Sequence, residues 1–89
     1  MHGLNRYINI VELVYSAHAV ERMQQRRISP SEVEKIVFEC DGNIRQSKDK
    51  TIYYKKLAGR KGNSAAVVVE KRLDLLEVLT VMNHFEVKK

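Results

Sequence analysis

The sequence predicts an α+β fold in which two N-terminal helices pack on one face of a roughly four-stranded antiparallel sheet. Residues 16–37 carry two successive helix signatures, and after Gly42 the hydrophobic period changes from that of a helix to that of a strand. The segments between the expected strands are short, which favours antiparallel neighbours. With 89 residues the chain has the length of one domain, which we expect to span 1–89 with residues 1–10 as a flexible arm.

The composition is typical of a folded protein in water, with 44% hydrophobic and 30% charged residues. No apolar run reaches the roughly 20 residues that cross a bilayer, and the N-terminal segment lacks the apolar core of a signal peptide. The single cysteine, Cys40, excludes an intramolecular disulfide and a zinc site built from several cysteines. We therefore expect a cytoplasmic protein that does not enter membranes and has neither a metal site nor a cofactor.

The first helix is predicted over residues 17–26. Residues 11–15 before it alternate in part and could form a short strand, and Ser16 is a favourable N-cap. Ala19, Val20 and Met23 lie within about 100° of arc at 3.6 residues per turn, so they form the expected core face.

The second helix begins with the clearest local signal in the chain. Ser29 is the expected N-cap, Pro30 the first helical residue, and Glu32 the partner that completes a capping box. Apolar residues follow at helical spacing, and they are Val33, Ile36, Val37 and Cys40. We interpret Cys40 as a small core residue rather than a nucleophile, and Asp41-Gly42 as the end of the helix.

Four strands are predicted next, over residues 43–47, 52–57, 65–70 and 76–83. Residues 48–50 form a polar turn, residues 58–64 the longest loop, residues 72–75 the last turn and residues 84–89 a tail. The third strand is continuously apolar, so we expect it at the centre of the sheet with both faces covered.

The positive charge of the chain, +5 in total, is concentrated in one block. Residues 43–63 contain seven Lys or Arg and one acid, whereas residues 1–42 contain five and six. Such a block favours a polyanionic partner, and its cations are the candidate RNA-binding residues Arg45, Lys48, Lys50, Lys55, Lys56, Arg60 and Lys61. A solvated hairpin, with lysines that protect sheet edges, explains the same charges, and the sequence leaves both interpretations open.

His18, Arg22 and Arg26 recur at every fourth residue and form a stripe beside the core face of the first helix, here called the His/Arg stripe. A neutral histidine beside arginines could take the proton of a ribose 2′-hydroxyl while the arginines stabilise charge on the phosphate. The stripe therefore predicts metal-independent RNA cleavage, with His84 as an alternative proton-transfer residue. A structural histidine, and ion pairs for the arginines, explain the same residues without any function.

Strand residues complete the candidate site. Tyr53 and Tyr54 point to opposite faces of one strand, so one should enter the core while the other lies outward, where it can stack on a base. Thr80 is expected on the same side of its strand as Val78 and Met82. It is either an ordinary β-branched strand residue or a small hydrogen-bond donor on the active face.

The segment Ser16-x-His18-Ala-x-x-Arg22-Met-x-x-Arg26-Arg27-Ile-Ser29 resembles the signature Ser/Thr-x-His-Ala-x-x-Arg-Met-x-x-Arg-Gly-Ile-Ser/Thr of a bacterial domain-of-unknown-function family. That family resembles the small toxin ribonucleases of the RelE and colicin D kind, which have the barnase–EndoU–colicin–RelE fold. The resemblance covers nearly the whole chain in element order and is specific over residues 16–37.

This resemblance implies a toxin ribonuclease with the catalytic residues His18, Arg22 and Arg26, and a protein antitoxin as a partner beside RNA. Tyr53 and Thr80 match the family by strand position alone. Arg27 departs from the signature, because the usual residue there is Gly, which is favoured where a helix ends in the left-handed conformation. The turn into the second helix could therefore differ from the family pattern.

Two classes of function remain open, an RNA-cleaving toxin-like domain and a non-catalytic module that binds nucleic acid or a protein. A concave pocket at His18, with at least two cations and a second proton-transfer group within hydrogen-bond reach, favours cleavage, whereas a flat surface favours binding alone. A structural domain that dimerises through its last strand is the third alternative.

Overall fold

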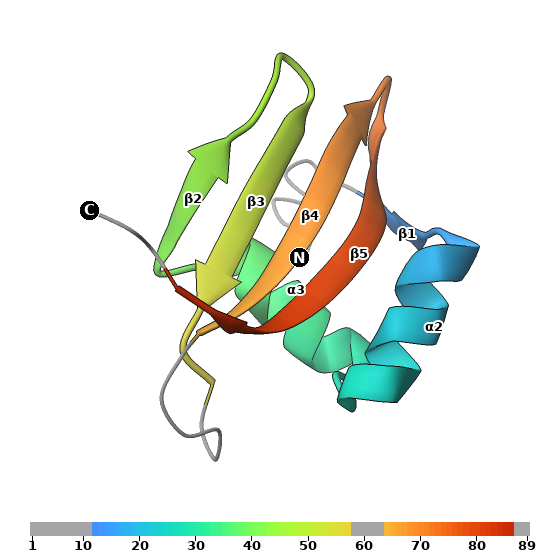
Figure 1. Cartoon of the computed structure of the whole chain (residues 1–89). Coiled ribbons are helices and arrows are strands. Elements are labelled where there is room, and N and C mark those ends of the chain that lie inside the picture. Colours follow the sequence, from blue (N-terminus) through green and yellow to red (C-terminus); the bar gives the residue numbers. More distant parts are fainter. Residues whose placement is uncertain (1–11, 58–63, 87–89) are drawn as a thin grey trace, which may run out of the picture.

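The computed structural model describes residues 12–57 and 64–86, so the expected arm at 1–10 and the cations Arg60 and Lys61 lie outside the described residues. The elements follow in the order β1 (Glu12–Tyr15), α2 (Ala17–Arg26), α3 (Pro30–Phe38), β2 (Gly42–Arg45), β3 (Lys50–Lys55), β4 (Ser64–Arg72) and β5 (Leu75–Phe85). All strands form one sheet in the order β1-β5-β4-β3-β2 (Figure 1). The predicted α+β class with two helices is confirmed.

Within the described residues the sheet is mixed and has five strands, where the sequence predicted about four antiparallel ones. β2, β3, β4 and β5 are antiparallel neighbours, but β1 pairs in parallel with β5, with Glu12 opposite Leu75 and Tyr15 opposite Val78. A local hydrophobic pattern can indicate a strand at residues 12–15, but it holds no information about a partner near the other end of the chain.

The sequence predicted that both helices pack on one face of the sheet, and this prediction was wrong. α3 packs against β3 and β4. α2 lies beside the sheet edge formed by β1 and β5, and it packs against β5 (Figure 1). β1 occupies the edge of β5 up to Val78, and the chain continues along that edge into α2, where the Ser16 N–H donates to the Val78 carbonyl at 3.1 Å. We call the face covered by α3 the helix face and the opposite one the open face.

Both helices begin where their capping residues predict. The Ser16 side chain accepts the Ala19 N–H at 3.0 Å. At α3, the Ser29 hydroxyl accepts the Glu32 N–H at 3.1 Å, and the Glu32 carboxylate accepts the Ser29 N–H at 2.9 Å. The predicted capping box is therefore confirmed, with Pro30 as the first residue of the helix.

The second helix ends earlier than predicted. α3 stops at Phe38 with Glu39 as its C-cap, two residues before Asp41. Cys40 consequently lies outside the helix and is half-buried, so its assignment to the core was wrong. Cys40 continues the apolar spacing of α3 in the sequence, but the chain has already left the helical path when it reaches this residue.

Arg27 ends α2 in the left-handed conformation, with φ 55° and ψ 49°. Its N–H points back to the carbonyls of Met23 and Gln24, as in a glycine-capped helix end. The turn into α3 thus has the geometry that favours Gly, although an arginine stands at this position. A side chain in this conformation costs about 1–2 kcal/mol.

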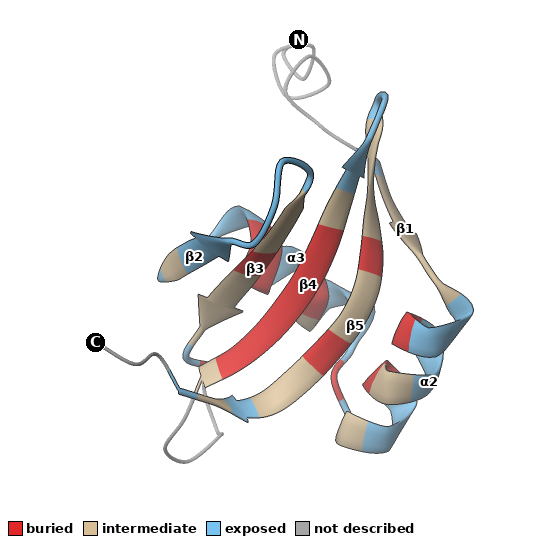
Figure 2. Cartoon of the chain, turned by 45° about the horizontal axis from the view of Figure 1, so that its top comes forward, coloured by how far each residue is buried: buried red, intermediate tan, exposed pale blue. Residues whose placement is uncertain are grey.

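The main core lies between the helix face of the sheet and α3. Its largest fully buried side chains are Val33, Ile36, Val67, Val69, Val78 and Val81. Figure 2 shows the longest buried run on β4, which confirms the predicted central position of that strand. Val20, which was expected in this core, is 43% exposed. Because α2 lies beside the sheet edge, only the face with Ala19 and Met23 reaches the core.

Two strand boundaries differ from the prediction in ways that affect the site. β3 already begins at Lys50, which was assigned to a turn, and β5 continues to Phe85, so His84 belongs to a strand and not to a tail. His84 has a φ of 56°, at a place where the register between β4 and β5 shifts. Such a bulge allows a strand to bend while it stays paired.

Candidate nucleic-acid interface

The His/Arg stripe lies on the surface of α2. His18 is exposed, and Arg22 and Arg26 are partly buried. The Arg22 Nε donates to His18 Nε2 at 3.3 Å, and its Nη1 donates to Gln25 Oε1 at 2.9 Å. Because a guanidinium group only donates, His18 accepts through Nε2, which assigns the imidazole proton to Nδ1 in a neutral ring.

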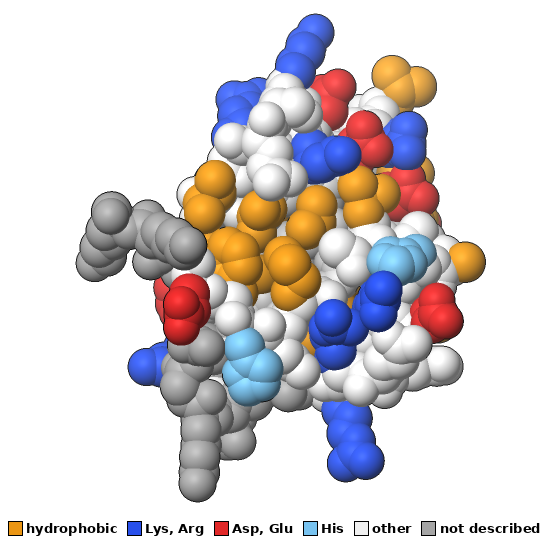
Figure 3. Space-filling view, viewed as in Figure 1, with side chains coloured by type: hydrophobic (Ala, Val, Ile, Leu, Met, Phe, Trp, Pro, Cys, Tyr) orange, Lys and Arg blue, Asp and Glu red, His pale blue; other side chains and the backbone are white. Residues whose placement is uncertain are grey.

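The helical wheel of α2 places the stripe on the side of the open face. Val20 and Gln24 line a hollow next to α3, on one side of the buried pair Ala19 and Met23. The stripe lies on the other side of that pair, because successive residues turn by 100°. Figure 3 agrees with this placement, since histidine and cationic side chains surround an apolar patch on the open face.

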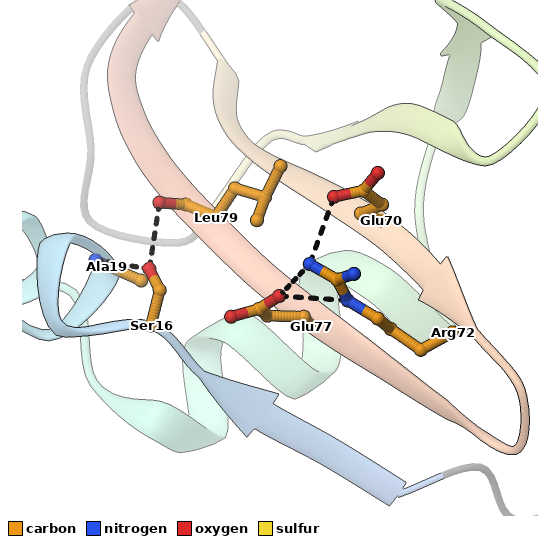
Figure 4. A network of polar contacts seen from close by, with 6 residues as sticks. All are labelled: Ser16, Ala19, Glu70, Arg72, Glu77 and Leu79. Carbon is orange, nitrogen blue, oxygen red and sulfur yellow. Dashed lines mark hydrogen bonds and ion pairs between the residues drawn. The ribbon is translucent and has the colours of Figure 1, made fainter.

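Hydrogen bonds to β5 hold both ends of α2. At the start of the helix, the Ser16 hydroxyl donates to the Leu79 carbonyl at 3.2 Å and accepts the Ala19 N–H (Figure 4). At the end, the Asn83 side-chain amide donates to the Arg26 carbonyl at 3.3 Å. The stripe is therefore positioned along residues 79–83 of the sheet edge, by polar contacts that the hydrophobic pattern of α2 could not indicate.

Thr80 lies on the open face, because β5 contains a bulge. Val78 pairs with Val69 on the helix face, whereas Thr80 pairs with Val68 on the open face, and Leu79 between them has no partner on β4. The expectation that Thr80 shares a side with Met82 is confirmed, but the expectation that Val78 lies there too was wrong. A strict two-residue period cannot account for an inserted residue. Thr80 therefore shares the open face with the His/Arg stripe.

Tyr53 lies on the other side of the sheet from Thr80. It pairs with Val67 and packs against the core of the helix face, whereas Tyr54 pairs with Ala66 on the open face. One tyrosine thus faces the core and the other faces outward, as the alternation predicted. Since Tyr53 and the His/Arg stripe are on opposite faces, the structure does not bring these candidate catalytic residues together.

Part of the basic block also lies around Tyr53 on the helix face. A small hollow of about 110 Å³ is lined there by Arg45, Lys48, Asp49, Thr51, Tyr53, Val69, Lys71 and Leu76. Arg45 donates to the carbonyls of Ser47 at 3.3 Å and Lys48 at 2.9 Å, so its guanidinium group stabilises the β2–β3 turn. These bonds leave Arg45 with fewer donors for a phosphate than an unbonded arginine has.

The remaining described cations of the block are divided between the two faces. Lys50 lies opposite Glu70 on the open face. Lys55 forms an ion pair with Asp41 at 3.5 Å, and the Lys56 N–H donates to the same carboxylate at 2.9 Å. The bond from Lys56, together with the charge of Lys55, lowers the pKa of Asp41 below its usual value. The predicted RNA-binding cations that the structure describes therefore do not form one continuous surface.

Sequence reasoning missed the apolar patch on the open face. The buried residues Ile52, Ala66 and Val68 form its floor, with partly buried side chains around them from Tyr54, Leu79, Met82 and Phe85. The rings of Tyr54 and Phe85 lie 5.7 Å apart at 32°. The continuously apolar β4 was the available signal, since a strand that is apolar on both sides places hydrophobic residues on each face of the sheet. We call these seven residues the open-face patch.

The far end of the open face, near the β4–β5 turn, carries a network of ion pairs. Arg72 donates to Glu77 at 2.6 Å and to Glu70 at 3.3 Å (Figure 4). The hydrogen bond to Glu77, followed by the charge of Glu70, raises the pKa of Arg72, and two carboxylates share one guanidinium group. The open face therefore has a basic side at α2 and paired carboxylates near this turn.

A larger hollow of about 460 Å³ lies between α2 and α3, and it is mainly apolar. Its lining includes Tyr15, Val20, Met23, Ile28 and Pro30. The Tyr15 hydroxyl is buried without a hydrogen-bond partner, and burial, with the charge of Glu34, raises the pKa of Tyr15. Arg27 is the one charged residue among the described residues that line this hollow.

Neither metal ligands nor a membrane-spanning helix are found in the described part of the chain. Among residues 12–57 and 64–86, no three His, Cys, Asp or Glu side chains are grouped in a way that could hold a metal ion. In the same ranges, no helix is long and apolar enough to cross a bilayer. The predictions of a metal-free and cofactor-free site and of a cytoplasmic location stay predictions.

Comparison with known proteins identifies a family that matches most of the chain. Residues 15–83, more than half of the chain, match the family model described as Domain of unknown function (DUF4258). The matched range contains the whole His/Arg stripe, Thr80 and most of the open-face patch. Neither the curated proteins nor the solved structures contain a match to the chain.

Proposed function

The chain belongs to the family Domain of unknown function (DUF4258), and on that premise we propose that it binds RNA on its open face and cleaves it without a metal ion. The observation that carries the proposal is the His/Arg stripe, which lies on the open-face side of α2, and α2 packs against β5, the strand that carries Thr80. The resemblance to toxin ribonucleases of the RelE and colicin D kind adds a toxin-like role, a cytoplasmic site of action and a protein antitoxin to the same proposal.

In the proposed reaction, the ribose 2′-oxygen attacks the neighbouring phosphorus and the bond to the 5′-oxygen breaks. In the structure His18 Nε2 accepts a hydrogen bond from Arg22, so this nitrogen carries a lone pair. The same lone pair takes the proton of the 2′-hydroxyl in the reaction. Arg22 must then turn from His18 to the phosphate, where Arg26 joins it and both stabilise the developing negative charge. The products are a 2′,3′-cyclic phosphate and a 5′-hydroxyl.

The leaving 5′-oxygen needs a proton from a second group. His84 on β5 and Tyr54 on β3 are the candidates, because His84 is exposed and the Tyr54 side chain belongs to the open face. Thr80 has a hydroxyl that can donate to a phosphate oxygen from the strand next to the stripe. Tyr53 is not proposed for this role, since it faces the opposite side of the sheet.

A second candidate function is RNA binding without cleavage. It is favoured by the exposure of His18, whose hydrogen bonds among the described residues come from Arg22 alone. A histidine at an open surface is not shielded from water, and among residues 12–57 and 64–86 no second proton-transfer group makes a hydrogen bond with His18. The His/Arg stripe would then contact phosphates only, and His18 would be one more donor in its protonated form.

Cleavage is tested by incubating the purified chain with total RNA in the presence of a chelator. We expect fragments that end in a 2′,3′-cyclic phosphate, detected by mass spectrometry. Replacing His18 by Ala should slow cleavage by about 100-fold or more, the usual contribution of a general base. Gln24→Ala is the matched control, because Gln24 is an exposed residue of the same helix on the side of the hollow between α2 and α3.

Binding is measured in parallel on a 2′-O-methyl RNA, which cannot form the cyclic phosphate. Each arginine of the stripe that contacts a phosphate of single-stranded RNA adds about 0.7 to the slope of log affinity against log salt. Arg22→Gln and Arg26→Gln should each reduce that slope. RNA binding that depends on these arginines, without any cleavage, establishes the second candidate. If the chain neither binds nor cleaves RNA, both candidates are wrong.

A further inference from the structure

The open-face patch is unusual for the outer face of a small sheet. α3 packs on the other face and α2 lies at the edge, so no described helix covers the patch. An antiparallel sheet with one solvated face normally shows polar residues there. Here four large apolar side chains lie around a buried floor. Figure 3 shows hydrophobic side chains gathered on this face of the molecule. The composition of the patch indicates a surface that binds something.

Two aromatic rings form one side of this patch. Ala66 lies between Tyr54 and Met82 in the same cross-strand row, and its small side chain lets the Tyr54 and Phe85 rings approach to 5.7 Å. On the other side of Tyr54, the residue opposite it on β2 is Gly42, which has no side chain. The phenol ring therefore lies over β2. Both rings are partly exposed, and exposed aromatic faces can stack on nucleobases.

The charges beside the patch determine which ligand it suits. The His/Arg stripe follows the β5 edge of the patch, and the carboxylates of Glu70 and Glu77 lie at the β4–β5 end. A ligand with a negative backbone and flat apolar groups matches this arrangement when its backbone follows the cations of α2, because the carboxylates at the β4–β5 end are already paired with Arg72. A purely apolar partner would leave the arginines of the stripe without a counter-charge.

We propose that the open-face patch binds the unstacked bases of single-stranded RNA, one of them on the Tyr54–Phe85 ring pair, while the His/Arg stripe holds the phosphates. This inference rests on the proposed function, in which the stripe binds RNA, and it adds the class of substrate. A duplex buries its base faces in its own stack and presents phosphates and ribose, so it gains nothing from an apolar floor. The chain therefore discriminates against paired RNA.

The test compares two forms of one uncleavable probe by fluorescence anisotropy. The probe is a 2′-O-methyl RNA of 12 nucleotides without self-complementarity, used alone and annealed to its complement at the same salt concentration. We expect at least tenfold tighter binding of the single strand. Equal or tighter binding of the duplex would overturn this inference and leave the proposed function standing, whereas binding of neither form would overturn both.

Matched variants locate the bases on the patch. Phe85→Leu keeps an apolar side chain but removes the ring, and it should weaken single-strand binding at least about 5-fold, the loss expected for one base–aromatic contact. Phe85→Trp should retain the binding of the wild type. Phe38→Leu is the control, because Phe38 is 54% exposed on α3, behind the sheet. Circular dichroism checks that each variant is folded, and equal binding by Phe85→Leu and Phe38→Leu contradicts the inference.

A second copy of the chain is the competing occupant of the patch. Sedimentation at several concentrations tests it, with Met82→Lys as the variant that places a charge within the patch. We expect the wild type to sediment as a monomer at the concentrations used for RNA binding. A dimer that Met82→Lys converts to a monomer would assign the patch to self-association and overturn the inference.

Discussion

Gly42→Ala should destabilise the protein by forcing the Tyr54 ring out of its place. Gly42 lies opposite Tyr54, and a Cβ added to Gly42 would collide with the phenol oxygen and lie 2.5 Å from Cζ and 3.1 Å from Cε2. Adding a methyl group to a filled space costs about 1–3 kcal/mol, and the Tyr54–Phe85 contact is worth about 0.5–1.5 kcal/mol more. Alanine recovers about 0.5–1 kcal/mol, because glycine loses more chain entropy on folding.

The partly exposed ring can swing towards water, which places the steric cost at the low end of its range. The free energy of unfolding should therefore fall by about 0.5–2 kcal/mol in total. For a urea m-value of about 1 kcal/mol/M, the midpoint of denaturation moves down by about 0.5–2 M. The assay is urea denaturation followed by far-UV circular dichroism.

A double-mutant cycle with Tyr54→Ser isolates the steric cause. In this background the ring is absent, so Gly42→Ala should be neutral or slightly stabilising, and the coupling energy between the two sites should be at least about 1 kcal/mol. If Gly42→Ala costs the same with and without the Tyr54 ring, the ring does not lie over Gly42 and the described geometry of the patch is wrong.

Three further predictions concern the ends of the helices and the β2–β3 region. Arg27→Gly should raise the free energy of unfolding by about 0.5–1 kcal/mol, because glycine adopts the left-handed conformation without the steric cost of a side chain. Thermal unfolding measures this change, and a lower melting temperature of the variant would contradict the prediction. Ser29→Ala should lower stability by about 1 kcal/mol through loss of the capping box, whereas Ser47→Ala, at an exposed serine of the β2–β3 turn, serves as the control. The pKa of Asp41 is lowered by folding, so its contribution to stability is fully present above its usual pKa of 3.8 and is lost as the pH falls through the lower folded value. The stability difference between the wild type and Asp41→Asn should therefore shrink only below about pH 4, and a difference that already disappears near pH 6 would refute this assignment.

The local parts of the fold could be read from the sequence because their causes are local. Ser16 and the Ser29–Glu32 capping box act within one helical turn, so α2 and α3 begin where predicted. The apolar run of residues 65–70 likewise predicted the central strand. The end of α3 was wrong because apolar spacing continues to Cys40 after the helical backbone has ended.

The rest of the fold depends on contacts that no local pattern records. The parallel pairing of β1 with β5 places α2 beside the sheet edge, and this position decides that Val20 is exposed. The bulge at Leu79 reverses the side on which the following residues of β5 lie, and it brings Thr80 to the open face. One inserted residue in a strand has no signature in composition or spacing.

The sequence predicted the chemical types of the candidate site residues, but not which of them the fold brings to the same surface. His18, Arg22 and Arg26 form one stripe because helical spacing alone determines it. Tyr53 and much of the basic block were assigned to the same surface, yet the register of β3 places Tyr53 on the helix face. The open-face patch was missed because its members come from three strands whose pairing the sequence does not specify.

The most direct test of the central claim, that RNA lies on the open face beside the His/Arg stripe, is a methyl NMR titration of the chain with the uncleavable single-stranded probe. Leu79 and Met82 on the patch should shift through the ring currents of the bound bases, whereas Val33 and Ile36 in the core below the helix face should not. Shifts confined to residues around the helix-face hollow, such as Val69 and Leu76, with unchanged Leu79 and Met82, would place the RNA on the opposite side of the sheet and contradict the account.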